Sequence, residues 1–562
     1  MKTLVCGLPS LGGPHLFSPT IMKRYLISLS VAFLAIAGTL GAQPSKVTKY
    51  TFSNDAETQL KELAANPMMQ YYAESRKAFA EKDVYHNRPI YHFTIPENHL
   101  NDPNGLCYWN GNWHMFYQAY PLLDPRQHWG HAISKDLIHW KDLPLAIYPD
   151  PERAVFSGAC MVEDGRVIAA YYGLGIGEMV AVSSDPLLLN WEKIGNAPVI
   201  EQPKDRNEKG YMTFDPCIWS KDGFYYMISG NSEMTGPGAR RRPVEYLFKS
   251  KDLKNWEYLH PFVEMDQYSL IGDDRACPYF WPIGNNGKYI LNQFSHKSGG
   301  KYLVGDYDKA RDKFVVTSGG SVNTGAINNG GVHAPSAYPD GEGGVYVIYN
   351  THALNPIPEV NTDCMTLVYR QTIDEYDRVH FTPAGDYASL RYNPVTLTDV
   401  ELPANKEVVI DAFRGKALEM EIEFDADTPS FEINVLRSPL KEEYTTITFY
   451  RDKGFNDRTK DGAEAIRDRY SVIEVDNAHG SLSENVTARE PDIKHVPMPA
   501  DGSLKLHIFI DQSIVEVFAN DYSVSMVRTW PIREDSDLVS FRAFGKPAKI
   551  KTLNAWQMKG IE

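Results

Sequence analysis

Cysteine is scarce in this sequence. Of the six cysteines, Cys6 precedes an apolar segment and the other five are an odd number, so at least one is free or bonds another chain. Their spacing matches no metal site, and we interpret them as small buried hydrophobic residues. The histidines are scattered without ligand spacing, and no phosphate-binding loop is evident. We therefore predict no metal and no cofactor.

The sequence also lacks a net positive charge and long apolar runs. The net charge is −15 and no long basic run occurs, which disfavours nucleic acids and anionic membranes as partners. The apolar run 25–37 is short for a membrane span. It follows Met22-Lys23-Arg24 and precedes small residues ending at Ala42, the pattern of a secretory signal. We expect residues 1–42 to be an upstream extension and signal peptide, and the protein to be exported to the periplasm or beyond the cell.

The length of 562 residues predicts two or more domains. Aromatic residues make up 12% of the chain, which suits many short strands or a sugar-binding surface. Residues 43–85 form a predicted helical extension, because Ala56 to Glu81 carries leucine, methionine and tyrosine among glutamate, lysine and alanine. We see no chemistry in this extension.

Residues 86–395 contain a repeat. An apolar strand, a turn with Asp, Asn or Gly, and a second strand recur five times, with turn glycines 54, 58, 64 and 57 residues apart. A unit of four short strands fits this spacing, so the repeat predicts a five-bladed β-propeller. The turn glycines are Gly111, Gly165, Gly223, Gly287 and Gly344.

A shorter echo supports the repeat. Ser-Lys-Asp-Leu occurs at 134–137 and again at 250–253, each time with a tryptophan three residues later, and a looser copy covers 183–191. We interpret these segments as turns between outer strands, with the tryptophan packing between blades.

A different pattern covers 400–562. Apolar and polar residues alternate in 504–510 and 514–518, which indicates half-buried antiparallel strands. The remaining length is enough for a β-sandwich. The predicted fold is therefore all-β: a five-bladed propeller, then a C-terminal sandwich, with a short helical extension in front.

Two aspartates occupy equivalent points of the repeat. Asp102 lies nine residues before its turn glycine, and Asp215 lies eight residues before its own. Each leads into the first strand of a unit, and in a propeller these first strands surround the central channel. Asp-Pro pairs commonly cap turns, but two at matching points favour a shared site. Carboxylates converging in an aromatic-rich funnel suggest glycoside cleavage.

These residues resemble glycoside hydrolase family 32, the invertase, levanase and inulinase group. The similarity runs from about 86 to 560, and order, spacing and both domains agree. The segments that carry it are 101–105 (NDPNG), 116–118 (FYQ), 128–132 (HWGHA), 134–137 (SKDL), 156–158 (FSG) and 509–518 (FIDQSIVEVF).

The resemblance implies roles for individual residues. Asp102 would be the nucleophile that forms a covalent fructosyl intermediate, and Asp215 would stabilise the transition state. Four more residues would contact the fructosyl unit, although packing or turn formation explains each of them about as well. These four are Asn101, Gln118, Trp129 and Ser157.

Two departures from the family pattern stand out. The family's Arg-Asp-Pro is Phe214-Asp215-Pro216 here, so a charged sugar contact is missing. The family's Glu-Cys-Pro begins with Ala276, so the general acid is absent from its usual place, and such an acid is worth about 10²–10⁴-fold in rate. Asp274 lies two residues before Ala276, on the same face of a strand, and is our predicted acid. Asp273 is the alternative, and the competing interpretation is that both aspartates simply lie in a solvated loop.

The sequence thus predicts an exported, retaining glycosidase that acts on a fructan, a fructo-oligosaccharide or another furanoside. The altered acid site and lost arginine suggest a substrate other than plain sucrose. One rival is a catalytically impaired carbohydrate-binding propeller that kept the nucleophile and lost the acid. A second is a related glycosidase acting on arabinosides or xylosides, against which the C-terminal signature argues.

Overall fold

The computed structural model describes residues 45–323, 331–351, 363–453, 470–487 and 489–561. The predicted signal peptide lies outside these residues. Within them, no helix combines the length and apolar character needed to cross a membrane.

Two helices come first in the described chain, as predicted: α1 (Ala56–Ala65) and α2 (Pro67–Lys82). Asn66 caps α2 by accepting a hydrogen bond from a backbone amide, and the proline that follows fits the first helical turn. Arg76 of α2 donates two hydrogen bonds to Asp142 on strand β4 (Lys141–Ile147), at 2.6 and 2.8 Å. This bidentate pair fastens the helix to the first sheet.

Five sheets of four or five strands follow one another along the chain. The first two sheets contain β1 (Leu100–Trp109), β2 (Asn112–Ala119), β3 (His128–Ser134) and β4 (Lys141–Ile147), then β5 (Val155–Glu163), β6 (Arg166–Gly173), β7 (Gly177–Ser183), β8 (Glu192–Lys193) and β9 (Ile200–Glu201). The third contains β10 (Pro216–Lys221), β11 (Phe224–Glu233), β12 (Arg242–Ser250) and β13 (Trp256–Pro261). The last two contain β14 (Val263–Glu264), β15 (Ala276–Ile283), β16 (Lys288–Ser295), β17 (Gly299–Asp308) and β18 (Lys313–Ser321), then β19 (Val332–Pro339), β20 (Val345–Thr351), β21 (Cys364–Met365), β22 (Tyr369–Ile373) and β23 (Val379–Pro383). Short helices are α3 (Arg206–Lys209), η1 (Pro237–Ala239) and η3 (Tyr387–Leu390).

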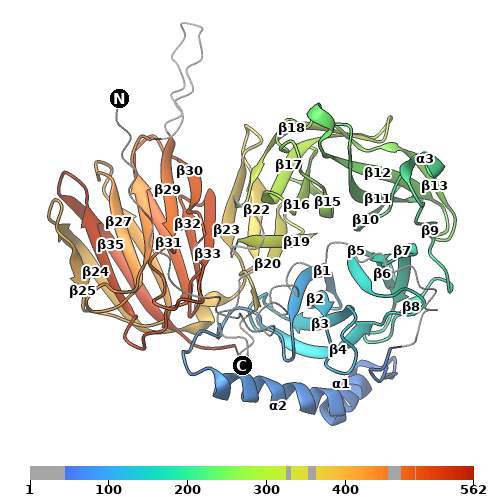
Figure 1. The fold of residues 1–562 in the computed structure, drawn as a ribbon, viewed down its shortest axis with the longest axis horizontal. Helices are drawn as coiled ribbons and strands as arrows, with labels where there is room; N and C mark the ends of the chain where they lie inside the picture. The colour runs from blue at the N-terminus through green and yellow to red at the C-terminus, as the bar shows by residue number, and fades with distance from the viewer. Residues whose placement is uncertain (1–44, 324–330, 352–362, 454–469, 488, 562) are drawn as a thin grey trace, which may run out of the picture. The chain divides into compact units, whose positions relative to one another are not determined.

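The five sheets close into a propeller. The first full strand of each blade contacts the first strand of the next: β1 with β5, β5 with β10, β10 with β15, β15 with β19, and β19 with β1. Figure 1 shows these strands on the inner side of the ring. The prediction of five blades whose first strands surround a channel is therefore confirmed.

The repeated glycines lie where the first two strands of each blade turn. Gly111, Gly165, Gly223 and Gly287 have φ of +75°, +80°, +74° and +80°, a conformation that favours glycine. In the fifth blade Gly341 and Gly343 take positive φ instead of the predicted Gly344.

The three repeated segments that end in a tryptophan form the same kind of turn. In each copy the indole donates a hydrogen bond to the carbonyl of the leucine three residues before it, at 2.9–3.1 Å. An aspartate carboxylate in each turn also accepts backbone amides. The tryptophans are Trp140, Trp191 and Trp256. The structural interpretation of this motif is confirmed.

Two six-stranded sheets form the C-terminal β-sandwich. In sheet order, one contains β24 (Arg391–Leu402), β35 (Ala548–Met558), β26 (Ala417–Phe424), β31 (Leu504–Asp511), β32 (Ile514–Ala519) and β33 (Ser523–Arg528). The other contains β25 (Val408–Ile410), β34 (Leu538–Ala543), β27 (Phe431–Arg437), β28 (Thr445–Tyr450), β29 (Tyr470–Asp476) and β30 (Asp492–Pro497). The apolar sides of both sheets enclose one core, as the alternating pattern predicts.

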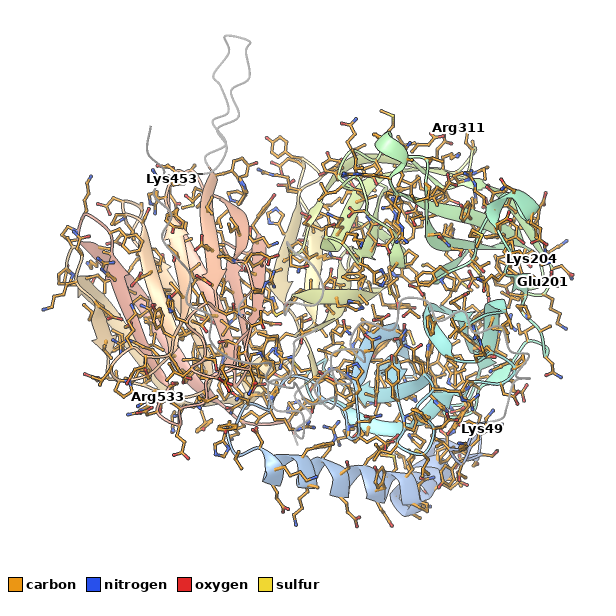
Figure 2. The ribbon with its side chains drawn as sticks, in the orientation of Figure 1. Lys49, Glu201, Lys204, Arg311, Lys453 and Arg533 are labelled. Carbon is orange, nitrogen blue, oxygen red and sulfur yellow. The ribbon has the colours of Figure 1, made fainter. Side chains whose placement is uncertain are left out.

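Charged side chains gather on the outside of the fold. Figure 2 shows Glu201 on β9 and Arg311 in the turn between β17 and β18 at the edge of the fold, and more than half of each side chain is exposed. By contrast, the five cysteines of the described residues are all free and buried. Their predicted role as small buried residues is confirmed.

A buried carboxylate joins the sandwich to the segment that leads into the propeller. Asp511 on β31 accepts hydrogen bonds from the backbone amides of Ile90, Tyr91 and His92 at 2.8–2.9 Å. The His92 ring also lies 2.9 Å from this carboxylate. Burial lowers the pKa of His92, but the carboxylates of Asp511 and Glu516 beside its ring outweigh burial and raise the pKa to about 9. The segment 509–518 is therefore joined to residues 90–92 by backbone hydrogen bonds and an ion pair, both made by Asp511.

We expect Asp511→Asn to destabilise the fold, because an amide N–H would face backbone N–H groups that now meet a carboxylate. Removing one partner of a buried ion pair costs about 3–5 kcal/mol. Chemical denaturation should show this loss. The control is Asp535→Asn on the exposed surface, which should leave the midpoint unchanged. Equal midpoints for both variants would show that the contacts of Asp511 do not stabilise the fold.

Candidate active site

Side chains from four blades meet at the Asp102 carboxylate. Ser157 donates a hydrogen bond of 2.5 Å to Oδ2, and the His333 Nε2 lies 2.9 Å from Oδ1. The Cys277 thiol lies 3.5 Å from Asp102 Oδ2 and 3.4 Å from Asp215 Oδ2. All of these side chains are nearly or fully buried. The structure thus brings the two predicted aspartates into one cluster.

The local sequence explains why Asp102 can sit there. Asn104 accepts a hydrogen bond from the Gly158 amide and donates one to the Asp102 carbonyl. Tyr279 on β15 donates to the Gly158 carbonyl at 2.7 Å and accepts from the Gly105 amide at 3.1 Å. A Cβ on Gly158 would lie 2.0 Å from the Ala170 carbonyl oxygen, so only glycine fits. These contacts hold three inner strands at a fixed spacing.

Three of the four predicted sugar-contact residues form a chain of hydrogen bonds. Asn101 donates to Gln118 Oε1 at 2.7 Å, Gln118 donates to Ser157 at 2.7 Å, and Ser157 donates to Asp102. Gln127 also donates to Gln118 Oε1 at 2.9 Å. Both ends of the Gln118 amide are therefore occupied, and the chain orients the Ser157 hydroxyl toward the carboxylate.

Trp129 does not join this chain. Its side chain is fully buried, stacks on Phe116 with ring centroids 5.6 Å apart, and donates to the Phe156 carbonyl at 2.9 Å. No surface is left for a ligand. The structure thus gives Trp129 a packing role in place of the predicted sugar contact, because the strand turns its indole into the space between blades.

The second carboxylate has a strongly perturbed environment. Asp215 Oδ2 accepts a 3.0 Å hydrogen bond from the Cys277 amide. Burial and the nearby Asp102 charge raise the pKa of Asp215 to about 7. Burial and the two carboxylates also raise the pKa of the Cys277 thiol, so that the thiol stays protonated between them. Two close carboxyls, one of them with a strongly raised pKa, are a typical arrangement for acid–base and covalent catalysis.

Comparison with known proteins identifies the family. The family model for the glycosyl hydrolases family 32 N-terminal domain matches residues 92–354, and the model for the C-terminal domain of the same family matches 386–557. The chain belongs to glycosyl hydrolase family 32. It is thus a glycosidase that hydrolyses O-glycosyl bonds, of the β-fructofuranosidase-like kind.

Individual relatives agree with this assignment. The chain is 27% identical to a levanase of Bacillus subtilis, over 84% of this chain and 71% of that one. It is 24% identical to the β-fructofuranosidase insoluble isoenzyme CWINV4 of Arabidopsis thaliana, over 87% and 93%. Among solved structures, fructan 1-exohydrolase IIa of Cichorium intybus superposes with a TM-score of 0.71 at 20% identity, covering 84% of this chain and 98% of that one. This last likeness supports the fold.

The site of this family 32 protein departs from the family pattern where the sequence indicates. Ala276 packs with Cys277, Phe294 and Ala334 in a small apolar cluster, against which Phe214 also lies. The places of the family's acid and of its arginine are thus filled by apolar groups.

Asp274 is not placed as a proton donor. Its carboxylate accepts a hydrogen bond from the His296 backbone amide at 2.9 Å, and Oδ2 lies 2.8 Å from the ring Nδ1 of the same histidine. Burial alone would raise the pKa of Asp274, but His296 lowers it overall. Asp274 is therefore ionised at neutral pH, which does not suit the predicted role of acid.

The alternative acid, Asp273, is held elsewhere. Its buried carboxylate accepts hydrogen bonds from the hydroxyls of Ser295 and Ser298 at 2.9 and 2.7 Å and from the Leu270 amide at 2.7 Å. These contacts give Asp273 a structural role in the loop that enters β15.

Two histidines of this site are not among the residues that the sequence predicts. His333 lies in the fifth-blade stretch that matches Asp102 and Asp215, so the repeat itself was the available signal. His296 follows the second strand of the fourth blade, and only strand pairing brings it to Asp274.

One histidine–carboxylate cluster of metal-binding size occurs in the described residues, and it lies away from this site, on the sandwich. Glu419, Glu421 and His507 form it. Arg391 pairs with both glutamates at 2.5 and 2.9 Å, so a side-chain cation already offsets part of the charge of this cluster.

We expect Asp102→Asn to lower the pKa of Asp215 below about 7, because the Asp102 charge is one of the two causes that raise it. An isotope-edited infrared titration of labelled aspartate carboxyls measures this directly. Asp374→Asn, in the outer part of the fifth blade, should leave the titration unchanged. An equal or higher pKa in Asp102→Asn would show that the two carboxylates do not interact.

Proposed function

We propose that this protein is an exported, retaining hydrolase of fructans, fructo-oligosaccharides or a related furanoside, with Asp102 as nucleophile. The observation that carries the proposal is the Asp102 carboxylate, fixed by Ser157, Cys277 and His333 beside a second carboxylate of raised pKa. A carboxylate held in a fixed geometry can attack a sugar carbon without first reorganising the surrounding solvent.

The contacts of the two aspartates suit them to different roles. The hydrogen bond from Ser157 and the close contact of the His333 imidazole orient the oxygens of Asp102, so a glycosyl–enzyme ester can form on this carboxylate. Asp215 faces the same cluster through Cys277. It would accept hydrogen bonds from sugar hydroxyls and stabilise positive charge that develops on the ring.

The substrate class is inferred from the relatives. Relatives and structural neighbours include a levanase, a fructan exohydrolase and an exo-inulinase. A variant of the chicory exohydrolase was solved in complex with 1-kestose. These names favour a fructoside polymer or oligomer as the substrate here.

One departure points to a changed sugar contact. Phe214 stands in place of the family's arginine and lies 5.4 Å, ring to ring, from Tyr172, which in turn lies 5.8 Å from Phe156. An aromatic row beside Asp215 favours stacking on a sugar face. This supports a substrate that differs from sucrose.

Export rests on the segment from Met22 to Ala42, with its basic start, short apolar run and small residues. A polysaccharide substrate is consistent with action outside the cytoplasm.

We expect the wild type to release fructose or another furanose from a panel of levan, inulin, kestose and arabinofuranosides. Asp102→Asn should show no release above background, and Asp215→Asn should lose about 10²–10³-fold in kcat, the cost of removing one group that stabilises the transition state. In methanol–water mixtures, NMR should show a product with the anomeric configuration of the substrate.

The control is Asp374→Asn, which should keep full activity. Thermal unfolding of each variant separates lost chemistry from lost folding. Binding of the panel sugars without any turnover by the wild type would contradict the proposal and favour the carbohydrate-binding alternative.

A further inference from the structure

We propose that His296, held by Asp274, is the acid–base catalyst of this site and supplies, from the turn after β16, the proton that Ala276 on β15 cannot supply. This inference rests on the proposed function, since it assigns the proton-transfer step of the same furanoside cleavage.

The pairing of β15 with β16 explains how a residue just beyond β16 can lie near the position of the missing acid. Ala276 pairs with Phe294 in the β15–β16 ladder. Beyond the end of this ladder, Asp274 precedes β15 and His296 follows β16, and the His296 backbone amide donates a 2.9 Å hydrogen bond to the Asp274 carboxylate. The His296 ring lies 5.3 Å, centroid to centroid, from the ring of Phe294, which pairs with Ala276, so His296 lies near the position where the family has its acid.

His296 is also close to the nucleophile. Its ring centroid lies 6.0 Å from that of His333, whose Nε2 is 2.9 Å from Asp102 Oδ1. The charges of Asp102 and Asp215 both act on His296. Its side chain remains 41% exposed, so a substrate can reach it, whereas Asp102 and Asp215 are buried.

The orientation of the imidazole is fixed by Asp274. Nδ1 lies 2.8 Å from Asp274 Oδ2, and among the described residues Nε2 has no protein hydrogen-bond partner. A carboxylate on Nδ1 sets the tautomer and leaves Nε2 for the substrate. This is the base–orienter pairing used when histidine moves a proton.

The surrounding charges favour a protonated His296. Burial lowers its pKa, but the hydrogen bond and charge of Asp274, with smaller effects from Asp102 and Asp215, raise the pKa above the usual value. His333 differs, because burial lowers its pKa and keeps it neutral. Of the two histidines at this site, His296 is therefore the one that can donate a proton.

Other buried carboxyls do not compete for the role. Glu178 accepts a hydrogen bond from Ser229 at 2.7 Å, and Glu245 forms an ion pair with Arg275. Burial raises the pKa of both, but neither has surface that a substrate could touch.

The reaction then balances in two steps. Asp102 attacks the anomeric carbon, the glycosidic C–O bond breaks, and the Nε2 proton of His296 moves to the leaving oxygen. Water next attacks the anomeric carbon and gives a proton to the neutral Nε2, while the ester bond to Asp102 breaks. The enzyme returns with a carboxylate at Asp102 and an imidazolium at His296.

The test compares leaving groups. For His296→Gln we expect kcat/KM to fall about 10²–10⁴-fold with an alkyl fructoside or fructo-oligosaccharide, the value of general acid help. With p-nitrophenyl β-D-fructofuranoside the first step needs no proton, so kcat/KM should fall less than about tenfold. Added imidazole should restore part of the lost activity in His296→Gly.

A pH profile provides a second readout. Wild-type kcat/KM should fall on the alkaline side as His296 loses its proton, above the usual histidine pKa of about 6.5. Asp274→Asn should move this limb to lower pH, because the charge that raises the His296 pKa is gone. His139→Gln is the matched control: its Nδ1 also lies 2.8 Å from an aspartate, Asp136, on an outer turn, and neither readout should change.

Two outcomes overturn the inference in distinguishable ways. An equal loss for both leaving groups in His296→Gln, or an unmoved alkaline limb in Asp274→Asn, would show that His296 is not the acid while the furanosidase function stands. No wild-type turnover of either fructoside or of any sugar in the furanoside panel would overturn the proposed function, and the assignment of His296 would fall with it.

Discussion

The buried carboxylate of Asp102 is the constraint on which the rest of the site depends. A charge removed from water must be met by donors with good geometry. Here the donors come from three other blades: Ser157 on β5, Cys277 on β15 and His333 on β19. The carboxylate is satisfied only when the ring of blades is closed. Ring closure in turn requires the close strand contacts at Gly105 and Gly158, bridged by Tyr279.

The environment gives chemically similar groups different protonation states. Burial and a neighbouring charge raise the pKa of Asp215, whereas His296 lowers that of Asp274. Asp274 raises the pKa of His296, whereas burial lowers that of His333. A pair of aspartates and a pair of histidines are thus each divided between two roles. This division can replace a missing glutamate without any change of fold.

Much of the fold follows from the sequence, because turn glycines and alternating strands are local signals. The repeat also predicts that Asp102 and Asp215 converge, since equivalent positions of a propeller meet at its channel. Side-chain direction was harder to predict. Trp129 belongs to a matching family segment, yet its strand turns the indole into the core.

The role of His296 could not be read from the sequence, because it depends on the β15–β16 register. The same holds for Asp511, whose partners at 90–92 lie far away in the chain. Both are long-range contacts between a carboxylate and a distant segment, and no local pattern encodes them. The departures at Phe214 and Ala276, in contrast, were visible at once from the residues.

The most direct measurement is peptide mass spectrometry of His296→Gln, quenched during turnover of p-nitrophenyl β-D-fructofuranoside. The account predicts that the ester forms quickly and then waits for a base, so the peptide that carries Asp102 should gain the mass of one fructosyl unit. The same experiment on Asp102→Asn should show no such gain. Turnover without an adduct on Asp102, or an adduct on another residue, would contradict the account.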